Sequence, residues 1–419
     1  MMTRCASLLM LVLLSASTLL AQSGGSAYSL VGLGDLVYFP STRSAGMGYT
    51  HLALPSPGTI NSVSPAAWSA IRHTILEGTV LYEGYNSTDG VRSRYLSDAD
   101  FNGGLLGLPL SEKLGLAVVL GFTPYSRVDY DTYGQDRFVA APQDTFAYSL
   151  HYVGTEGLGK GRLGVAISPI EGLAVGGAFE YIFGTFERTL EQIPDDANLY
   201  RGGTQRQTTR ANGAQGTFSL IFNGFGQIAD VLEPLSIGGL ISTRSVVQYT
   251  QRNIYEFSTV RDTLTDVEGE AVIPLAYGAG VAYRVTPRLL LAADYYNQAW
   301  RKSEIAGVRP PNIRNAHRFG VGLEWGASPL PTAGWAQRLA FRLGYSYNAS
   351  YVELNGRQIT EWALTAGLDF PFSGLTRLSL AGSFGQRGTT EDNLIKDTII
   401  RVAVSLTIAE QWFVRPEDD

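Results

Sequence analysis

Strict alternation of apolar and polar residues in the last third of the chain constrains the fold more than any other feature. The alternation runs through 318–325 and returns at 338–348, 361–370 and 400–408. A period of two residues indicates β-strands with one apolar and one polar face. Each apolar face runs for about ten residues, the length of a tilted strand that crosses a bilayer. Aromatic residues near the ends of these faces, as in the girdles of outer-membrane barrels, are Trp325, Tyr345, Tyr347, Trp362 and Phe370.

The pattern predicts an all-β fold, a transmembrane antiparallel β-barrel of about 14 strands, because bacterial barrels have even strand counts. That count requires 143–169 to be one strand. Glycine inside a strand often marks a bulge, so we expect this strand to carry a kink at Gly154, Gly157, Gly159 and Gly161, the position at which the resemblance described below implies a lateral gate. We expect extracellular loops at 187–213 and 252–270, and a tight turn at 169–172.

Residues 1–21 have the pattern of a cleaved signal peptide. Arg4 supplies the positive charge, an apolar run reaches Leu20, and Ala21 is a small residue before the cut. The single cysteine, Cys5, precedes the apolar run, so the mature chain forms no disulfide. After the signal, no apolar stretch is long enough for a transmembrane helix. These features predict export to the cell outer membrane of a Gram-negative bacterium.

About fifty residues, 22–72, precede the first strand and lack sustained alternation. A stretch this long in a compact protein needs a structural role. Ser64 followed by Pro65 is typical of the start of a helix, so we expect a short helix over 65–71 with Ser64 as its N-cap.

Two short motifs resemble the FadL/TodX family of outer-membrane transporters for hydrophobic compounds, including the relatives near the type IX secretion shuttle barrel. Arg43, Gly46, Met47 and Gly48 match the first motif. The second is an Asn-Pro-Ala box, matched by Pro65 and Ala66, with Ser64 in place of Asn. The run 385–396 also looks like the family. The resemblance implies a signal peptide at 1–21, an N-terminal hatch inside the lumen at 22–72, a barrel at 73–410 and a periplasmic tail at 411–419.

The resemblance also implies a function, passive uptake of hydrophobic compounds that leave sideways through a gap at a kinked strand. Long-chain fatty acids are the leading substrate class. The alternative is a non-enzymatic scaffold or shuttle barrel that binds exported proteins. A lipid hydrolase using Ser149 and His151, two residues apart on one strand face, is a third hypothesis. We expect the chain not to be an enzyme.

The sequence gives no sign of a metal or cofactor. The four histidines have no metal-ligand spacing: His51, His73, His151 and His317. A net charge of −6 argues against a nucleic-acid partner. The expected partners are a hydrophobic ligand, membrane lipid and lipopolysaccharide, whose phosphates suit the basic cluster of Arg201, Arg206 and Arg210. The oligomeric state stays open.

Charged residues on the predicted inward faces have two interpretations. They are Arg318, Arg338, Arg342, Arg377 and Arg401, with Glu324, Glu361 and Asp369 among them. They form either a lumen that attracts carboxylates or a network of ion pairs that anchors the hatch. We favour the network, because acids and bases are interleaved and charges of low exposure must be paired.

Overall fold

The computed structural model describes residues 24–38, 41–141, 144–195, 201–257, 260–328, 333–373 and 375–410. The expected signal peptide at 1–21 and the expected tail at 411–419 lie outside the described residues.

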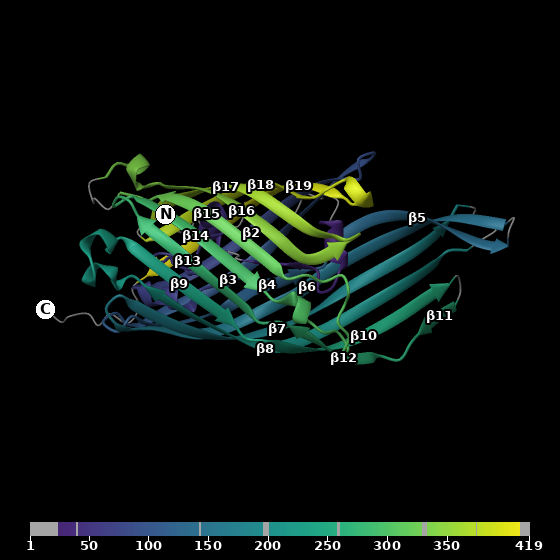
Figure 1. The fold of residues 1–419 in the computed structure, drawn as a ribbon, viewed down its shortest axis with the longest axis horizontal. Coiled ribbons are helices and arrows are strands. Elements are labelled where there is room, and N and C mark those ends of the chain that lie inside the picture. Colours follow the sequence, from purple (N-terminus) through teal and green to yellow (C-terminus); the bar gives the residue numbers. More distant parts are fainter. Residues whose placement is uncertain are drawn as a thin grey trace.

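Within the described residues, fourteen strand positions close into an antiparallel β-barrel (Figure 1). β19 pairs with β2 from Lys396 opposite Thr88 to Glu410 opposite Thr74, which closes the sheet. At three of these positions, two successive strands follow one another along the wall and count as one. In chain order the positions are β2 (Thr74–Thr88), β3 (Ser93–Ser111), β4 (Leu116–Arg127) with β5 (Tyr130–Ala141), β6 (Asp144–Ile170), β7 (Leu173–Pro194), β8 (Gly203–Phe222), β9 (Leu235–Ser242) with β10 (Ser245–Phe257), β12 (Val267–Ile273) with β13 (Ala276–Arg284), β14 (Leu289–Gln298), β15 (Ala316–Trp325), β16 (Ala340–Leu354), β17 (Arg357–Ser373), β18 (Thr376–Gly388) and β19 (Lys396–Glu410).

The strand count confirms the fold predicted from alternation, including the single long strand β6. The tight turn is also confirmed, since β6 ends at Ile170, β7 begins at Leu173, and Gly172 between them has a φ of 80°.

The prediction of long loops at 187–213 and 252–270 is wrong, because strands fill most of both segments. β7 continues to Pro194 and β8 begins at Gly203, with Thr189 opposite Arg206. β10 continues to Phe257, β11 (Val260–Thr263) pairs back onto it, and β12 begins at Val267. These strand ends lie beyond the apolar part of the wall. Alternation is lost where neither face is apolar, although the hydrogen bonds between strands continue.

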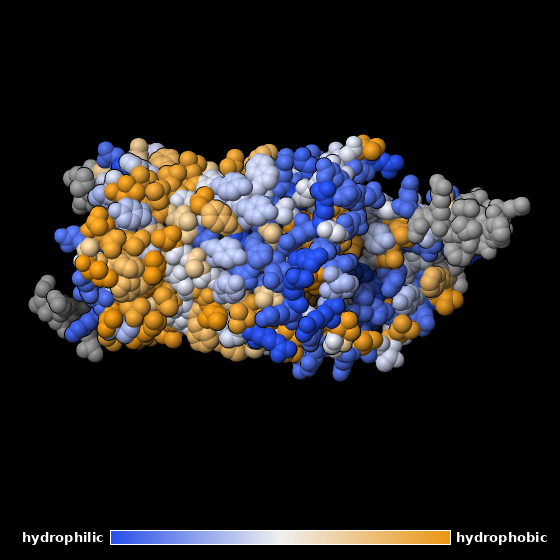
Figure 2. Space-filling model, viewed as in Figure 1, coloured by the Kyte–Doolittle hydropathy of each residue, from blue (hydrophilic) through white to orange (hydrophobic). Residues whose placement is uncertain are grey.

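The outer surface of the barrel carries an apolar belt at the end where the chain makes its short turns. Figure 2 shows this end covered by hydrophobic residues, whereas the end with the long hairpins is mostly hydrophilic. Side chains that project outward within the belt include Leu163, Phe179, Leu220, Leu291, Leu343 and Leu364, each at least 45% exposed. Exposed apolar area of this extent is typical of a surface that meets lipid or a partner. Among the described residues, no helix has the length and hydropathy to cross a membrane.

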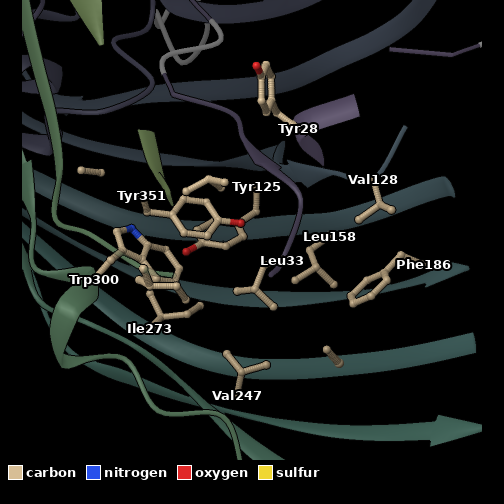
Figure 3. Packing of buried hydrophobic residues seen from close by; sticks show 14 of the residues in the cluster. Tyr28, Leu33, Tyr125, Val128, Leu158, Phe186, Val247, Ile273, Trp300 and Tyr351 are labelled. Atoms are coloured by element: carbon tan, nitrogen blue, oxygen red, sulfur yellow. The ribbon is translucent and has the colours of Figure 1, made fainter. Parts of the chain in front are cut away.

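The described parts of the N-terminal segment, 24–38 and 41–72, lie inside the barrel, and we call them the hatch. Its elements are η1 (Ala27–Leu30), β1 (Asp35–Leu36), α2 (Thr42–Gly46) and η2 (Pro65–Ala70). α2 packs on β16 to β19, whereas η2 packs on β4 and β6 to β8, so the hatch touches opposite walls. Figure 3 shows Tyr28 and Leu33 of the hatch among wall residues such as Tyr125, Leu158 and Tyr351. Burial of this apolar cluster stabilises the hatch inside the lumen.

Candidate functional site

The first hatch motif is pressed against a glycine-lined part of the barrel wall. A Cβ atom added to Gly46 would lie 2.9 Å from Cα of Gly367. One added to Gly344 would lie 2.8 Å from Cα of Gly48, and closer still to the Gly48 nitrogen. Main chain therefore packs on main chain, and neither side has room for a side chain. The wall glycines are Gly320, Gly322, Gly344 and Gly367.

Gly48 needs to be glycine for a second reason. Its φ is 62°, in the left-handed region that favours glycine. Its amide also donates a hydrogen bond of 2.8 Å to Thr365 Oγ1 on β17. Met47 beside it is fully buried. The turn after α2 is thus held by backbone conformation, wall contact and a hydrogen bond together.

The second motif lies at η2, where the expected helix is a 3-10 helix over Pro65–Ala70. Ser64 precedes it, but its side chain does not cap the helix and instead donates to Ser219 Oγ at 3.1 Å. Ser64 thus occupies the predicted N-cap position before Pro65, although its hydroxyl makes no capping bond. The side-chain oxygen of Asn61 accepts hydrogen bonds from the amides of Val63 (3.0 Å) and Ser64 (2.9 Å). A carboxamide three residues upstream organises this turn.

Ion pairs tie the hatch to the wall at Arg43. Its guanidinium lies against Glu324, with Nη2 to Oε1 at 2.8 Å and Nε to Oε2 at 2.9 Å. Glu324 also accepts from Arg342 Nε at 2.6 Å, and Arg342 continues to Asp369 at 2.7 and 2.5 Å. The side chains of Arg342 and Asp369 are buried, and that of Glu324 is 12% accessible. Each of these buried charges is therefore paired, as low-dielectric surroundings require.

A second chain of ion pairs crosses the lumen from the hatch residue Asp35. Arg387 Nη2 lies 2.7 Å from Glu361 Oε2, and Arg401 Nη1 lies 2.5 Å from Glu361 Oε1. In spatial order the chain is Asp35, Arg387, Glu361, Arg401, Glu83 and Arg127. These contacts confirm an ion-pair network for five of the predicted inward charges, Arg342, Arg401, Glu324, Glu361 and Asp369. The Arg318 guanidinium stacks on the hatch rings Tyr49 and Tyr38, 4.4 and 5.1 Å from the centroids.

Arg338 lies apart from this network. It ends η6 (Trp335–Arg338), before β16 starts, and donates to the carbonyl of Ala333 at 2.9 Å. The expected inward strand position of Arg338 is therefore wrong. The apolar–polar alternation of β16 extends back over Arg338 in the sequence, although this residue belongs to a short helix.

His51 lies in the hatch against β14. The amides of His51 and Leu52 donate to Asp294 Oδ2 at 2.6 and 2.8 Å, and His51 Nδ1 bonds the carbonyl of Tyr49 at 2.7 Å. Burial lowers the pKa of His51 from 6.5 to about 3, so its imidazole stays neutral in the folded protein.

We expect this buried imidazole to make the folded barrel less stable in acid. The pKa of His51 is lower in the folded state, so the stabilisation is complete above pH 6.5 and decreases as pH falls towards 3. Urea unfolding in detergent at pH 8 and pH 5 should show that wild type loses roughly 2 kcal/mol more than His51→Asn. His317→Gln, at the rim, should behave as wild type. An equal loss in wild type and His51→Asn would contradict this assignment.

The wall of the barrel is interrupted between β3 and the β4–β5 position. β3 pairs with β4 only from Gly104 opposite Phe122 to Ser111 opposite Leu116. Among the described residues, no ladder joins 93–103 of β3 to β4 or β5. Pro124 lies in β4 two residues after Phe122, the last residue of β4 that pairs with β3, and it has no N–H to donate. We call this opening the lateral window.

The far end of the window is closed by side chains rather than by backbone. Arg94 of β3 makes a bidentate contact with Asp131 of β5, at 2.9 Å for both bonds. The hatch lies behind the window, where Gly25 N donates to the Asp129 carbonyl at 3.2 Å and Ser29 Oγ donates to it at 2.8 Å. The window is therefore bounded at one end by the β3–β4 ladder, at the other end by the Arg94–Asp131 pair, and on the lumen side by the hatch.

A pocket of about 480 Å³ occupies the lateral window. Phe101 and Phe122 stand at its outer side and are 59% and 38% exposed. Arg127 and Asp129 form its inner limit and also line a central pocket of about 110 Å³ in the lumen. The central pocket is also lined by members of the second ion-pair chain, such as Glu361 and Arg401, and by hatch residues such as Tyr38 and Tyr49.

The four glycines expected to form a kink and gate lie in β6, one strand away from the interruption, where β4 pairs with β1 of the hatch instead of with β3. β6 changes partner between Gly154, opposite Tyr130 of β5, and Gly157, opposite Arg127 of β4. The positive φ of 72° in this stretch belongs to Glu156, not to a glycine. All four glycines have strand partners on both sides, and Gly154, Gly157 and Gly159 line the window pocket, whereas Gly161 does not. The structure thus brings three of the four to the window.

The histidines are spread over the molecule. His151 Nε2 bonds Asp131 at 2.9 Å and its ring stacks on Tyr133 at 4.2 Å, and Ser149 takes no part in these contacts. Such an arrangement orients the imidazole towards an acid and an aromatic ring rather than a nucleophile. Within the described residues, no three metal-ligand side chains of His, Cys, Asp or Glu converge.

Solved structures of similar fold are channels and transporters by description. They include a monoaromatic hydrocarbon channel, CymD (14% identity, 93% of this chain and 100% of that chain, TM-score 0.58) and the Ralstonia pickettii toluene transporter TbuX (14%, 87% and 97%, 0.57). A Pseudomonas aeruginosa FadL homologue is similar as well (12%, 89% and 98%, 0.57). At this identity the likeness shows a shared fold.

No curated protein sequence matches the chain. A family profile described as BamG matches residues 1–417, which is nearly the whole chain. The fold of this chain is a barrel of the FadL and TodX type. The chain belongs to the BamG family.

Proposed function

We propose that this chain is an outer-membrane barrel that takes up small hydrophobic compounds passively through the lateral window. The observation that carries the proposal is the window itself, an interruption of the sheet with a 480 Å³ pocket inside it. A pocket of this size matches those that hold small organic ligands. The apolar belt on the outer surface and the expected signal peptide support an outer-membrane location.

The window lets a ligand enter or leave through the side of the barrel. Its outer side is apolar, with Phe101 and Phe122 exposed on the outside of the wall. Unpaired backbone is costly in lipid, but here the hatch and the side chains of Arg94 and Asp131 back the opening. An apolar compound can thus exchange between pocket and membrane without crossing water.

The ligand class is narrowed by the charges of the pocket. CymD and TbuX are described as a monoaromatic hydrocarbon channel and a toluene transporter, which supports a neutral hydrophobic ligand. Long-chain fatty acids are the class implied by the FadL resemblance. Asp98, Asp100 and Asp129 line the pocket, however, and would repel an ionised carboxylate. We therefore favour hydrophobic compounds without an anionic group.

The test is photolabelling of the purified barrel in mild detergent with a neutral diazirine-tagged alcohol, followed by peptide mapping. We expect labelling to concentrate on the window segments of β3 and β4. Phe101→Ala combined with Phe122→Ala should reduce it about tenfold, because two aromatic contacts are lost. Phe179→Ala is the control, since Phe179 is 60% exposed on the belt away from the window. Uniform labelling around the belt would overturn the proposal.

A second candidate, the scaffold barrel that binds exported proteins, is favoured by the way the hatch is held. Ion pairs at Arg43 and main-chain packing at Gly48 fix it to the wall, and the central pocket is only about 110 Å³. A fixed plug leaves no wide path to the periplasm. An unlabelled window together with a reproducible co-purifying protein would select this function instead.

We also propose contact with lipopolysaccharide on the outside of β8. Arg206 and Arg210 are exposed there, with Arg206 Nε 3.1 Å from Glu187 Oε1. Arg201, just before the strand, is exposed too. Guanidinium groups of this spacing suit phosphate oxygens.

A further inference from the structure

The lining of the lateral window is unusually acidic for an opening beside an apolar surface. Four carboxylates line its pocket: Asp98, Asp100, Asp129 and Glu156. The one cation of the lining, Arg127, is already engaged, because it pairs with Glu83 and donates to Asn102 at 3.2 Å. Its contact with Asp100 is looser, at 3.6 Å. The pocket therefore carries an excess of negative charge that the protein itself does not neutralise.

A separate observation shows a polar group that the protein leaves unsatisfied at this pocket. Ser126 lines it, is only 2% exposed, and its hydroxyl has no hydrogen-bond partner among the described residues. A buried hydroxyl without a partner costs free energy unless a bound molecule satisfies it. A ligand with N–H or O–H groups would do so.

The occupant is not a bare metal ion. Within the described part of the chain, no three carboxylate, imidazole or thiol side chains converge on one point. The carboxylates are instead spread around a volume of about 480 Å³ that has the rings of Phe101, Phe122 and Tyr130 in its lining. Aromatic faces attract organic cations and also pack against apolar tails. Spread carboxylates with aromatic rings fit a larger, partly apolar cation.

We propose that the lateral window binds the ammonium head of a cationic amphiphile, with its apolar tail directed past Phe101 and Phe122 to the outside of the wall. This proposal rests on the proposed uptake function and specifies the ligand class of the same site. The ammonium group lies among Asp98, Asp100 and Asp129, and one of its N–H groups donates to Ser126 Oγ. The backbone of Asp129 is fixed by Gly25 and Ser29 of the hatch, so the site is formed before the ligand arrives.

The test compares three probes of equal chain length, dodecylammonium, dodecanol and dodecanoate, by native mass spectrometry of the full barrel in a neutral detergent. We expect dodecylammonium to bind at least about tenfold more tightly than dodecanoate, because opposite charges attract at short range in a partly desolvated pocket. In the double variant Asp98→Asn with Asp100→Asn, the ratio of the dodecylammonium affinity to the dodecanoate affinity should fall towards one.

The matched control is Asp230→Asn combined with Asp262→Asn, which removes two exposed carboxylates far from the window. It should keep the wild-type ratio. Ser126→Ala should weaken dodecylammonium more than a fully apolar probe, and heat-modifiable gel migration checks that every variant is folded.

The outcomes separate this inference from the proposed function. If dodecanol binds at the window but dodecylammonium binds no better, the charge preference is wrong and the uptake function stands. If dodecanoate binds most tightly, or if the Asp98 and Asp100 substitutions leave the ratio unchanged, the inference is also wrong. If no probe binds, the uptake function fails together with it.

Discussion

Gly344→Ala should prevent the hatch from seating and should destabilise the barrel by about 3 kcal/mol or more. The added methyl group would lie 2.8 Å from Cα of Gly48 and closer to its nitrogen, and both partners are backbone that cannot rotate away. The strand conformation at Gly344 is ordinary, so the effect comes from the clash alone. Urea unfolding in detergent measures the loss, and limited proteolysis at 41–72 reports on the hatch.

Gly78→Ala is the matched control for this substitution. Gly78 also lies in a barrel strand, β2, but an added Cβ would meet no atom within 4 Å. Its free energy of unfolding should stay within about 0.5 kcal/mol of wild type. Equal effects of Gly344→Ala and Gly78→Ala would mean that close packing of the hatch on the wall does not matter for stability.

Glu324→Gln should cost about 3–5 kcal/mol, because it leaves two buried guanidinium groups without their shared carboxylate. Glu324 accepts from Arg43 of the hatch and from Arg342 of the wall. The loss should therefore appear both in global unfolding and in faster proteolysis of the hatch. Adding Arg43→Met to Glu324→Gln should recover part of the stability, since one uncompensated charge is then removed.

Glu391→Gln is the control for the ion-pair experiment. Glu391 lies 2.8 Å from Arg357 in an exposed turn, where 67% of its side chain is accessible. An ion pair in water contributes little, so the change should be below about 1 kcal/mol. If Glu324→Gln were as mild, the network would be dispensable for holding the hatch.

The barrel was predictable because one alternating strand already shows which of its faces is apolar. The same pattern in β15 to β17 and β19 was enough for the fold class, the strand count also needed 143–169 to be one strand, and the resemblance located the hatch motifs. The glycines that receive the hatch, such as Gly320 and Gly344, read in the sequence only as part of a mixed inward face. Their role depends on the hatch backbone that packs against them from the lumen, and the alternation within a strand carries no information about that contact.

The lateral window was harder to place, because strand pairing is a property of two segments rather than one. The glycine-rich run in β6 borders the pocket, but the interruption itself lies between β3 and β4. The signals that lie at the window were Pro124 inside an alternating strand and the Asp98-Ala99-Asp100 sequence inside β3. Proline removes a ladder donor, and paired acids are unfavourable on a lipid-facing strand. Asn61 was likewise missed, because its two hydrogen bonds form only in the folded turn.

The enclosure of the hatch has a consequence for how the chain must fold. Ser26 donates a 2.5 Å hydrogen bond to Asp397, 371 residues away, and Thr42 bonds Ser405 on the last strand. The wall glycines approach too closely for a preformed cylinder to admit the hatch by sliding. The N-terminal segment therefore gains these contacts only when the last strand has joined the sheet around it. Contacts between such distant residues form slowly, and an interval of exposure to proteases and to holding chaperones is built into the topology.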